Sequence, residues 1–186
     1  MPPDVLDALK KLIAPIAVLA IAVIIWRVRN LSLRDDLAVV APRARDALLW
    51  IVVWVAWMAL SEFVANKVGV EAPEIWSDRS VAAMGVLFVG MVLLAPIGEE
   101  LVFRGLLYGR LANTSLGPAG AVAVAAVVFG LLHIRYGWVL VAFVVVDGVW
   151  YGIARVTSGT VIIPMIMHVM GNLLAWYQHL PRNSGG

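Results

Sequence analysis

The sequence contains no cysteine among its 186 residues. This absence excludes disulfide bonds, thiolate metal sites and a cysteine nucleophile. Charge is also scarce, because only 14% of the residues are Asp, Glu, Lys or Arg, whereas a typical soluble domain has about 25%. The formal net charge is only +2, and no block of basic residues indicates a nucleic-acid partner.

Apolar residues make up most of the chain. They account for 62% of it, and the mean hydropathy is +0.93. The apolar runs are continuous rather than alternating, which is typical of membrane-spanning helices and not of membrane β-strands. We therefore predict an all-α, polytopic transmembrane helix bundle that is surrounded by membrane lipid.

Six apolar segments are long enough, or nearly long enough, to cross a bilayer as helices. The first could also be a signal peptide, but its apolar run continues to Trp26 without a cleavage site, which favours an uncleaved helix. A separate half-helix after the third span would raise the count to seven. The expected spans are residues 12–28, 46–65, 81–97, 118–134, 138–154 and 160–177.

The connector between the first two spans is rich in arginine, which predicts that it faces the cytoplasm and that both termini face outward. We divide the chain into two N-terminal spans, within residues 1–79, and a core of four spans, within residues 80–180. The arginines concerned are Arg27, Arg29, Arg34, Arg43 and Arg45.

Two adjacent carboxylates follow the third apolar run in the stretch "LLAPIGEELVFRGLLYGRL". Ionisable groups at membrane depth are costly and are candidates for function by default. Arg104 lies four residues after Glu100, so the two side chains share a helix face and are expected to pair. Glu99 then points elsewhere and is free for chemistry.

Further polar residues interrupt the later spans. His133 ends the fourth span, one turn after Phe129, while His168 and Asn172 share a face of the sixth, and Asp147 interrupts the fifth. A single buried histidine is more often a hydrogen-bonded core residue than a catalyst. Several costly groups in lipid are better explained if they converge on one site.

Such a site has the inventory for hydrolysis of a peptide bond. A carboxylate beside an imidazole can activate water, and further imidazole and amide donors can stabilise an oxyanion. Zinc bound by Glu99, His133 and His168 is an alternative, as are a proton-coupled transporter and a non-catalytic scaffold. The chain has no Gly-x-Ser-x-Gly elbow and no second intramembrane Asp to pair with Asp147.

Three motifs in order, "EELVFR", "FGLLH" and "HVMGN", resemble those of the CPBP family of intramembrane proteases. This family is also called the CAAX protease and bacteriocin-processing, or abortive-infection, family. The matching positions cover Glu99, Glu100 and Arg104, then Phe129 and His133, then His168 and Asn172. The similarity extends over roughly residues 80–178, and the first two spans carry no motif.

The resemblance implies a role for each matching residue. Glu99 would activate water with His133, and His168 and Asn172 would form the oxyanion site. Glu100, Arg104 and Phe129 would support this geometry. Family members have been described both as metal-independent glutamate proteases and as metalloproteases, so the resemblance leaves open whether zinc is needed, and the reading favoured here has no cofactor.

The resemblance further implies a peptide or membrane-protein substrate and a multi-pass protein of the bacterial plasma membrane. A role in bacteriocin immunity without catalysis is the alternative within the same family. Asp147 falls where related sequences usually carry small or apolar residues. We expect it to have a structural role or to line an access channel.

Overall fold

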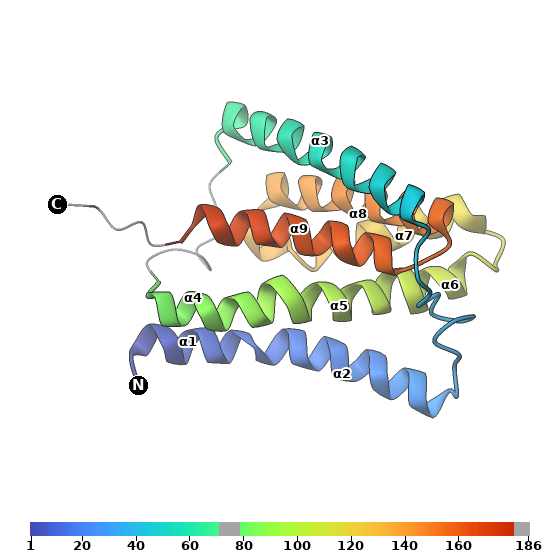
Figure 1. Ribbon diagram of the computed structural model, residues 1–186, viewed down its shortest axis with the longest axis horizontal. Helices are drawn as coiled ribbons and strands as arrows, with labels where there is room; N and C mark the ends of the chain where they lie inside the picture. Colours follow the sequence, from blue (N-terminus) through green and yellow to red (C-terminus); the bar gives the residue numbers. More distant parts are fainter. Residues whose placement is uncertain (71–78, 181–186) are drawn as a thin grey trace.

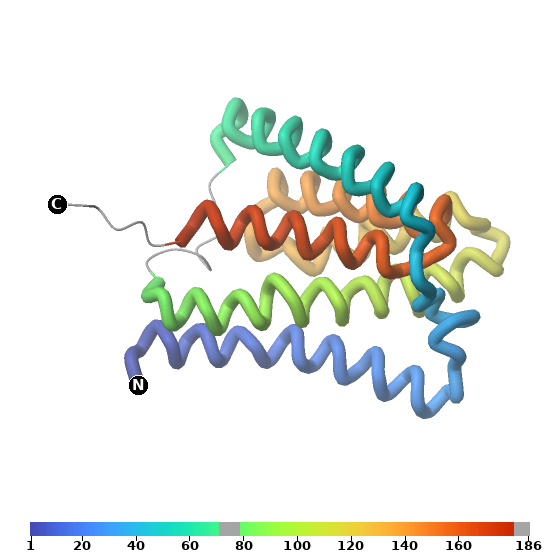
Figure 2. The backbone as a smooth tube through the Cα atoms, in the orientation of Figure 1, coloured from blue at the N-terminus to red at the C-terminus, as the bar shows by residue number. Residues whose placement is uncertain are grey.

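The computed structural model describes residues 1–70 and 79–180, and within these ranges the chain is helical without any strand. Six helical rods lie side by side in the bundle shown in Figures 1 and 2. The elements in chain order are α1 (Pro3–Lys11), α2 (Ile13–Val28), α3 (Ala44–Val68), α4 (Val81–Leu87), η2 (Phe88–Leu94), α5 (Ala95–Glu100), η3 (Leu101–Leu107), α6 (Tyr108–Leu111), α7 (Gly117–Leu131), η4 (Ile134–Tyr136), α8 (Trp138–Ser158) and α9 (Ile162–Gln178).

Four of the rods are long and apolar enough to cross a membrane, which confirms the predicted transmembrane helix bundle. These are Pro3–Val28, Ala44–Val68, Val81–Leu111 and Trp138–Ser158. The helix α7 is apolar but shorter, and α9 has 17 residues. The chain is therefore an integral membrane protein with six helical rods, of which four have the length and hydropathy of full spans.

The first rod begins earlier than expected, at Pro3, and is interrupted at Leu12 between α1 and α2. Pro15 explains the interruption. A proline within a helix has no N–H to donate, and its ring clashes with the carbonyl four residues earlier. That carbonyl belongs to Lys11, the last residue of α1.

The third rod is longer than expected. It does not end at residue 97 but continues from Val81 to Leu111, so the half-helix alternative is wrong. Two of its segments, η2 and η3, are π-helical, and such segments often occur at functional sites. The rod continues past Glu100, whose carboxylate is paired with Arg104 one turn later on the same rod.

The third rod, drawn in green, lies between α2 and α9 in Figure 1. The helix α2 packs on one side of it, and α9 packs on the other side, against both the rod and α3. The helices α7 and α8 form a close pair. Glycines permit this close approach, since a Cβ at Gly148 would lie 3.0 Å from the Cα of Ala126.

The arginine-rich connector before α3 is held against the turn that joins α8 to α9. Val161 N–H donates to the carbonyl of Ala38 at 3.0 Å, and the Thr160 hydroxyl donates to the carbonyl of Val40 at 2.7 Å. The expected connector at residues 69–78 lies mostly outside the described residues. One end of the bundle therefore carries the connector, and α3 runs from it toward the opposite end.

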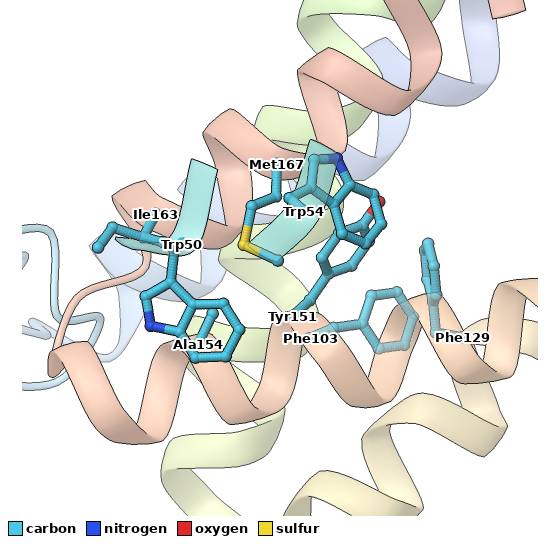
Figure 3. Packing of buried hydrophobic residues seen from close by; sticks show 8 residues of the cluster. All are labelled: Trp50, Trp54, Phe103, Phe129, Tyr151, Ala154, Ile163 and Met167. Carbon is cyan, nitrogen blue, oxygen red and sulfur yellow. The ribbon is translucent and has the colours of Figure 1, made fainter. Parts of the chain in front are cut away.

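The largest buried apolar cluster joins α3 to the later helices. Figure 3 shows its members, which lie on α3, η3, α7, α8 and α9. Because α3 comes from the N-terminal part of the chain, both parts of the sequence build one core. The cluster consists of Trp50, Trp54, Phe103, Phe129, Tyr151, Ala154, Ile163 and Met167.

Candidate active site

A buried ion pair lies at the centre of the bundle. Arg104 Nη1 donates to Glu100 Oε1 at 2.9 Å, and the two side chains are 1% and 0% exposed. This is the i, i+4 pair expected from the sequence. A buried pair of this kind is only tolerated when further contacts replace the lost hydration.

Those contacts come mainly from α7 and α8. Arg104 Nη2 donates to the carbonyl of Gly148 at 2.9 Å. The guanidinium also lies 4.8 Å from the ring centroid of Phe129 and 5.1 Å from that of Tyr151, within range for cation–π attraction. Arg104 thus fixes the third rod to the α7–α8 pair and holds Glu100 in place.

His168 contacts both members of the glutamate pair. Its Nδ1 lies 3.0 Å from Glu100 Oε1, and its Nε2 lies 3.7 Å from Glu99 Oε2. A carboxylate can only accept, so Nδ1–H is the donor to Glu100. The ring is stacked on Tyr151 with centroids 5.1 Å apart. Glu100 and Tyr151 together orient His168, and its Nε2 faces Glu99.

His133 follows the end of α7 and is held in a similar way. Its Nδ1 donates to the carbonyl of Phe129 at 2.9 Å, because a carbonyl only accepts. This leaves Nε2 of the neutral ring as the free nitrogen. The ring of Phe129 lies 5.0 Å from that of His133 and 5.6 Å from that of His168, so Phe129 separates and orients both imidazoles.

Asn172 binds the third rod through a backbone carbonyl that the helix itself leaves free. In η2, Ala95 N–H donates to Gly90 O rather than to Met91 O, and the next residue, Pro96, has no N–H. Asn172 Nδ2 donates to Met91 O at 2.7 Å. The second hydrogen of the same amide remains available to another acceptor.

A cavity of about 330 Å³ opens between α3, α8 and α9 and reaches these polar residues. His133, His168 and Asn172 line it, and so does Phe129. Glu99 is not among the lining residues; its side chain is 21% exposed and meets the site through Nε2 of His168. The structure thus brings the predicted residues into one region.

Asp147 also lines this cavity, and it accepts a hydrogen bond from Trp57 Nε1 at 2.6 Å. Asp147 thus has a contact with α3 and a place on the cavity wall, while its role stays a prediction. Sequence reasoning missed Trp54 and Tyr151 as cavity residues and Trp57 as the partner of Asp147. The signal for Tyr151 was its spacing, four residues after Asp147 on one helix face; no signal marked the tryptophans.

The residues proposed as zinc ligands are engaged differently. His168 Nδ1 is bonded to Glu100, which is itself paired with Arg104. Within residues 1–70 and 79–180, no three His, Asp or Glu side chains are grouped so as to hold a metal ion. Nε2 of His168 faces Glu99, and histidines that bind zinc commonly donate Nδ1–H to a carboxylate. The zinc alternative therefore stays a prediction, and the proposed mechanism uses side chains alone.

A family comparison bears on the same region. The family model described as "Type II CAAX prenyl endopeptidase Rce1-like" matches residues 81–174, half of the chain, and includes every residue of the three motifs. No curated protein matches the chain. No solved structure matches it either.

Proposed function

Since the chain belongs to the type II CAAX prenyl endopeptidase Rce1-like family, we propose that it is an intramembrane endopeptidase with a glutamate-activated water. The observation that carries the proposal is the convergence of two imidazoles on one cavity, with Glu99 Oε2 3.7 Å from the nearer one. The substrates are peptides or membrane proteins that enter this cavity.

Glu99 and His133 are the proposed base. The Glu99 carboxylate removes a proton from water, and Nε2 of His133, whose Nδ1 is bonded to Phe129 O, assists. The resulting hydroxide attacks the carbonyl carbon of the scissile peptide. When the tetrahedral intermediate collapses, the same proton passes to the departing amine, so the groups that acted as base then act as acid.

His168 and Asn172 are the proposed oxyanion donors. Asn172 offers its second amide hydrogen, since the first is bonded to Met91. His168, whose Nδ1 is bonded to Glu100, donates from Nε2 in the imidazolium form, in which both ring nitrogens carry a hydrogen. Glu100 is a positioning residue, because it contacts His168 rather than the substrate.

The test is cleavage of a broad library of apolar and amphipathic peptides by the purified protein, followed by mass spectrometry. We expect Glu99→Gln to lower kcat/KM by roughly 10²–10⁴-fold, the range for loss of a general base. Asp46→Asn removes a carboxylate on α3 that does not line the cavity, and it should retain wild-type cleavage. Unchanged cleavage by Glu99→Gln would contradict the assignment of the base.

Parallel reactions with a chelator test the zinc alternative. Activity that survives the chelator supports the metal-independent mechanism, whereas loss that added zinc reverses would contradict it. A folded wild-type protein that cleaves neither peptides nor membrane-protein substrates would contradict the protease and favour a scaffold or immunity function.

A further inference from the structure

The cavity carries negative charge that the proposed chemistry does not use. Among the described residues that line it there are two carboxylates besides the motif residues, Asp147 and Glu62, and no Lys or Arg. Glu62 lies near the end of α3 and is exposed, whereas Asp147 lies deeper, on α8. A cleft with one sign of charge and low-dielectric walls attracts groups of the opposite sign.

Asp147 is held so that only one of its oxygens is occupied. Trp57 Nε1 donates to Oδ1 at 2.6 Å. Among the described residues nothing donates to Oδ2, and the side chain is partly exposed on the cavity wall. A carboxylate has four acceptor sites, so the indole orients Asp147 and leaves acceptors for a group inside the cavity.

The spacing of Asp147 and Tyr151 on α8 gives an approximate distance from Asp147 to the proposed site of cleavage. Tyr151 lies one turn further along α8, about 6 Å at 1.5 Å per residue, and its ring is stacked on His168. An extended peptide advances about 3.3–3.6 Å per residue. A substrate that lies extended along α8, with its scissile bond at His168, would span this separation with about two residues.

The rest of the wall around Asp147 is apolar. Met58 of α3, Leu140, Phe143 and Val144 of α8, and Leu174 of α9 line the same cavity. A basic side chain suits this environment, because its methylene stem packs against apolar groups while its charged end reaches a carboxylate. An acidic side chain would meet Asp147 and Glu62 with like charge.

We propose that Asp147 is a specificity-determining residue that binds a Lys or Arg side chain of the substrate, about two residues from the scissile bond. This rests on the proposed endopeptidase function. The substrate class is then an apolar peptide segment that contains one basic residue near the cleavage point. Trp57 is the positioning residue for this subsite.

The first experiment compares matched peptides that carry either Lys or norleucine at each position within three residues of the cleaved bond. We expect the wild-type protein to cleave the Lys peptide at least 10-fold better at one position. Asp147→Asn, whose amide oxygen still accepts from Trp57, should bring the ratio to within 2-fold. Asp46→Asn should keep the wild-type ratio, and Glu62→Gln should change it by about 2-fold.

A purely structural contact between α3 and α8 would give a different result. Asp147→Asn and Trp57→Phe would then lower thermal stability and reduce cleavage of both peptides equally, with the ratio of Lys to norleucine unchanged. That outcome overturns the proposal. So does a wild-type protein that cleaves both peptides equally at every position.

A binding measurement keeps this test independent of turnover. The affinities of the same Lys and norleucine peptides are measured on Glu99→Gln, with and without Asp147→Asn. If Glu99→Gln binds the Lys peptide more tightly and Asp147→Asn removes this preference, the subsite is supported even when no peptide is cleaved. Failure of the protease proposal is then recognised separately from failure of the subsite. Equal binding of the two peptides overturns the subsite.

Discussion

The helices α2 and α3 look alike in sequence but have different places in the molecule. Both are apolar, both lack a motif, and both lie outside the residues matched by the family. The helix α2 packs behind the glutamates, where a Cβ on Gly98 would lie 3.0 Å from the backbone nitrogen of Leu19. In contrast, α3 supplies Trp54 to the cavity wall, and its Trp57 donates a hydrogen bond to Asp147, which lines the same cavity.

The difference teaches that a segment without a motif can still form part of the site. In a soluble helix the buried face is marked by its apolar residues. In a membrane helix the lipid-facing side is equally apolar, so composition does not separate the two faces. The roles of α2 and α3 follow from packing, and substitutions can test them separately.

The largest expected effect comes from breaking the buried ion pair between Glu100 and Arg104. Glu100→Ala leaves the buried guanidinium of Arg104 without its counter-ion, and we expect a loss of about 3–5 kcal/mol in the free energy of unfolding. Thermal or denaturant unfolding of the purified protein measures the loss. Glu62→Ala, at an exposed position on α3, is the control. Equal stability of both variants would show that the ion pair is not required.

The next effect concerns α2. Gly98→Ala places a methyl group 3.0–3.3 Å from the backbone and Cβ of Leu19, so α2 must move away, at a cost of about 1–3 kcal/mol. Gly85→Ala is a matched control on the same rod, because nothing lies within 4 Å of its added Cβ. There we expect a change of at most about 1 kcal/mol, in the stabilising direction. The same unfolding assay measures both variants. Equal losses of stability in Gly98→Ala and Gly85→Ala would contradict the close packing of α2 against the third rod.

A smaller effect separates two tryptophans on α3, both visible in Figure 3. Trp50 Nε1 donates to the Thr157 hydroxyl at 3.2 Å, so Trp50→Phe should cost about 0.5–1.5 kcal/mol for the hydrogen bond. Trp54 Nε1 has no partner among the described residues, so Trp54→Phe loses no hydrogen bond. Only Trp54 lines the cavity, and only its replacement should change kcat/KM.

The substitutions that should change stability least test which way α3 crosses the membrane. The chain has no cysteine, so single cysteines can be labelled without background. Leu33→Cys in the arginine-rich connector and Val68→Cys at the end of α3 replace exposed side chains. We expect an impermeant thiol reagent to label Val68→Cys in intact cells and Leu33→Cys only after permeabilisation. The reverse pattern would contradict the predicted orientation.

The sequence predicted the local part of the site. Six helices, and the pair of Glu100 with Arg104, follow from apolar run lengths and from i, i+4 spacing. The contacts of Asp147 with Trp57 and of Asn172 with Met91 join residues far apart in the chain. They depend on how helices rotate against one another, which uniform apolarity does not encode. The catalytic roles of Glu99 and His133 remain predictions.

Pro96 has a consequence for how substitutions combine. Its missing N–H leaves the Met91 carbonyl to Asn172, so a contact within one helix has been replaced by a contact between two helices. Residues 96 and 172 are therefore energetically coupled. Asn172→Ala should lower the free energy of unfolding more in the wild-type chain, with Pro96, than in a Pro96→Ala background. The effects of substitutions at residues that share a partner are not additive. A substitution at one of these positions is therefore expected to change the stability effect of a substitution at the other.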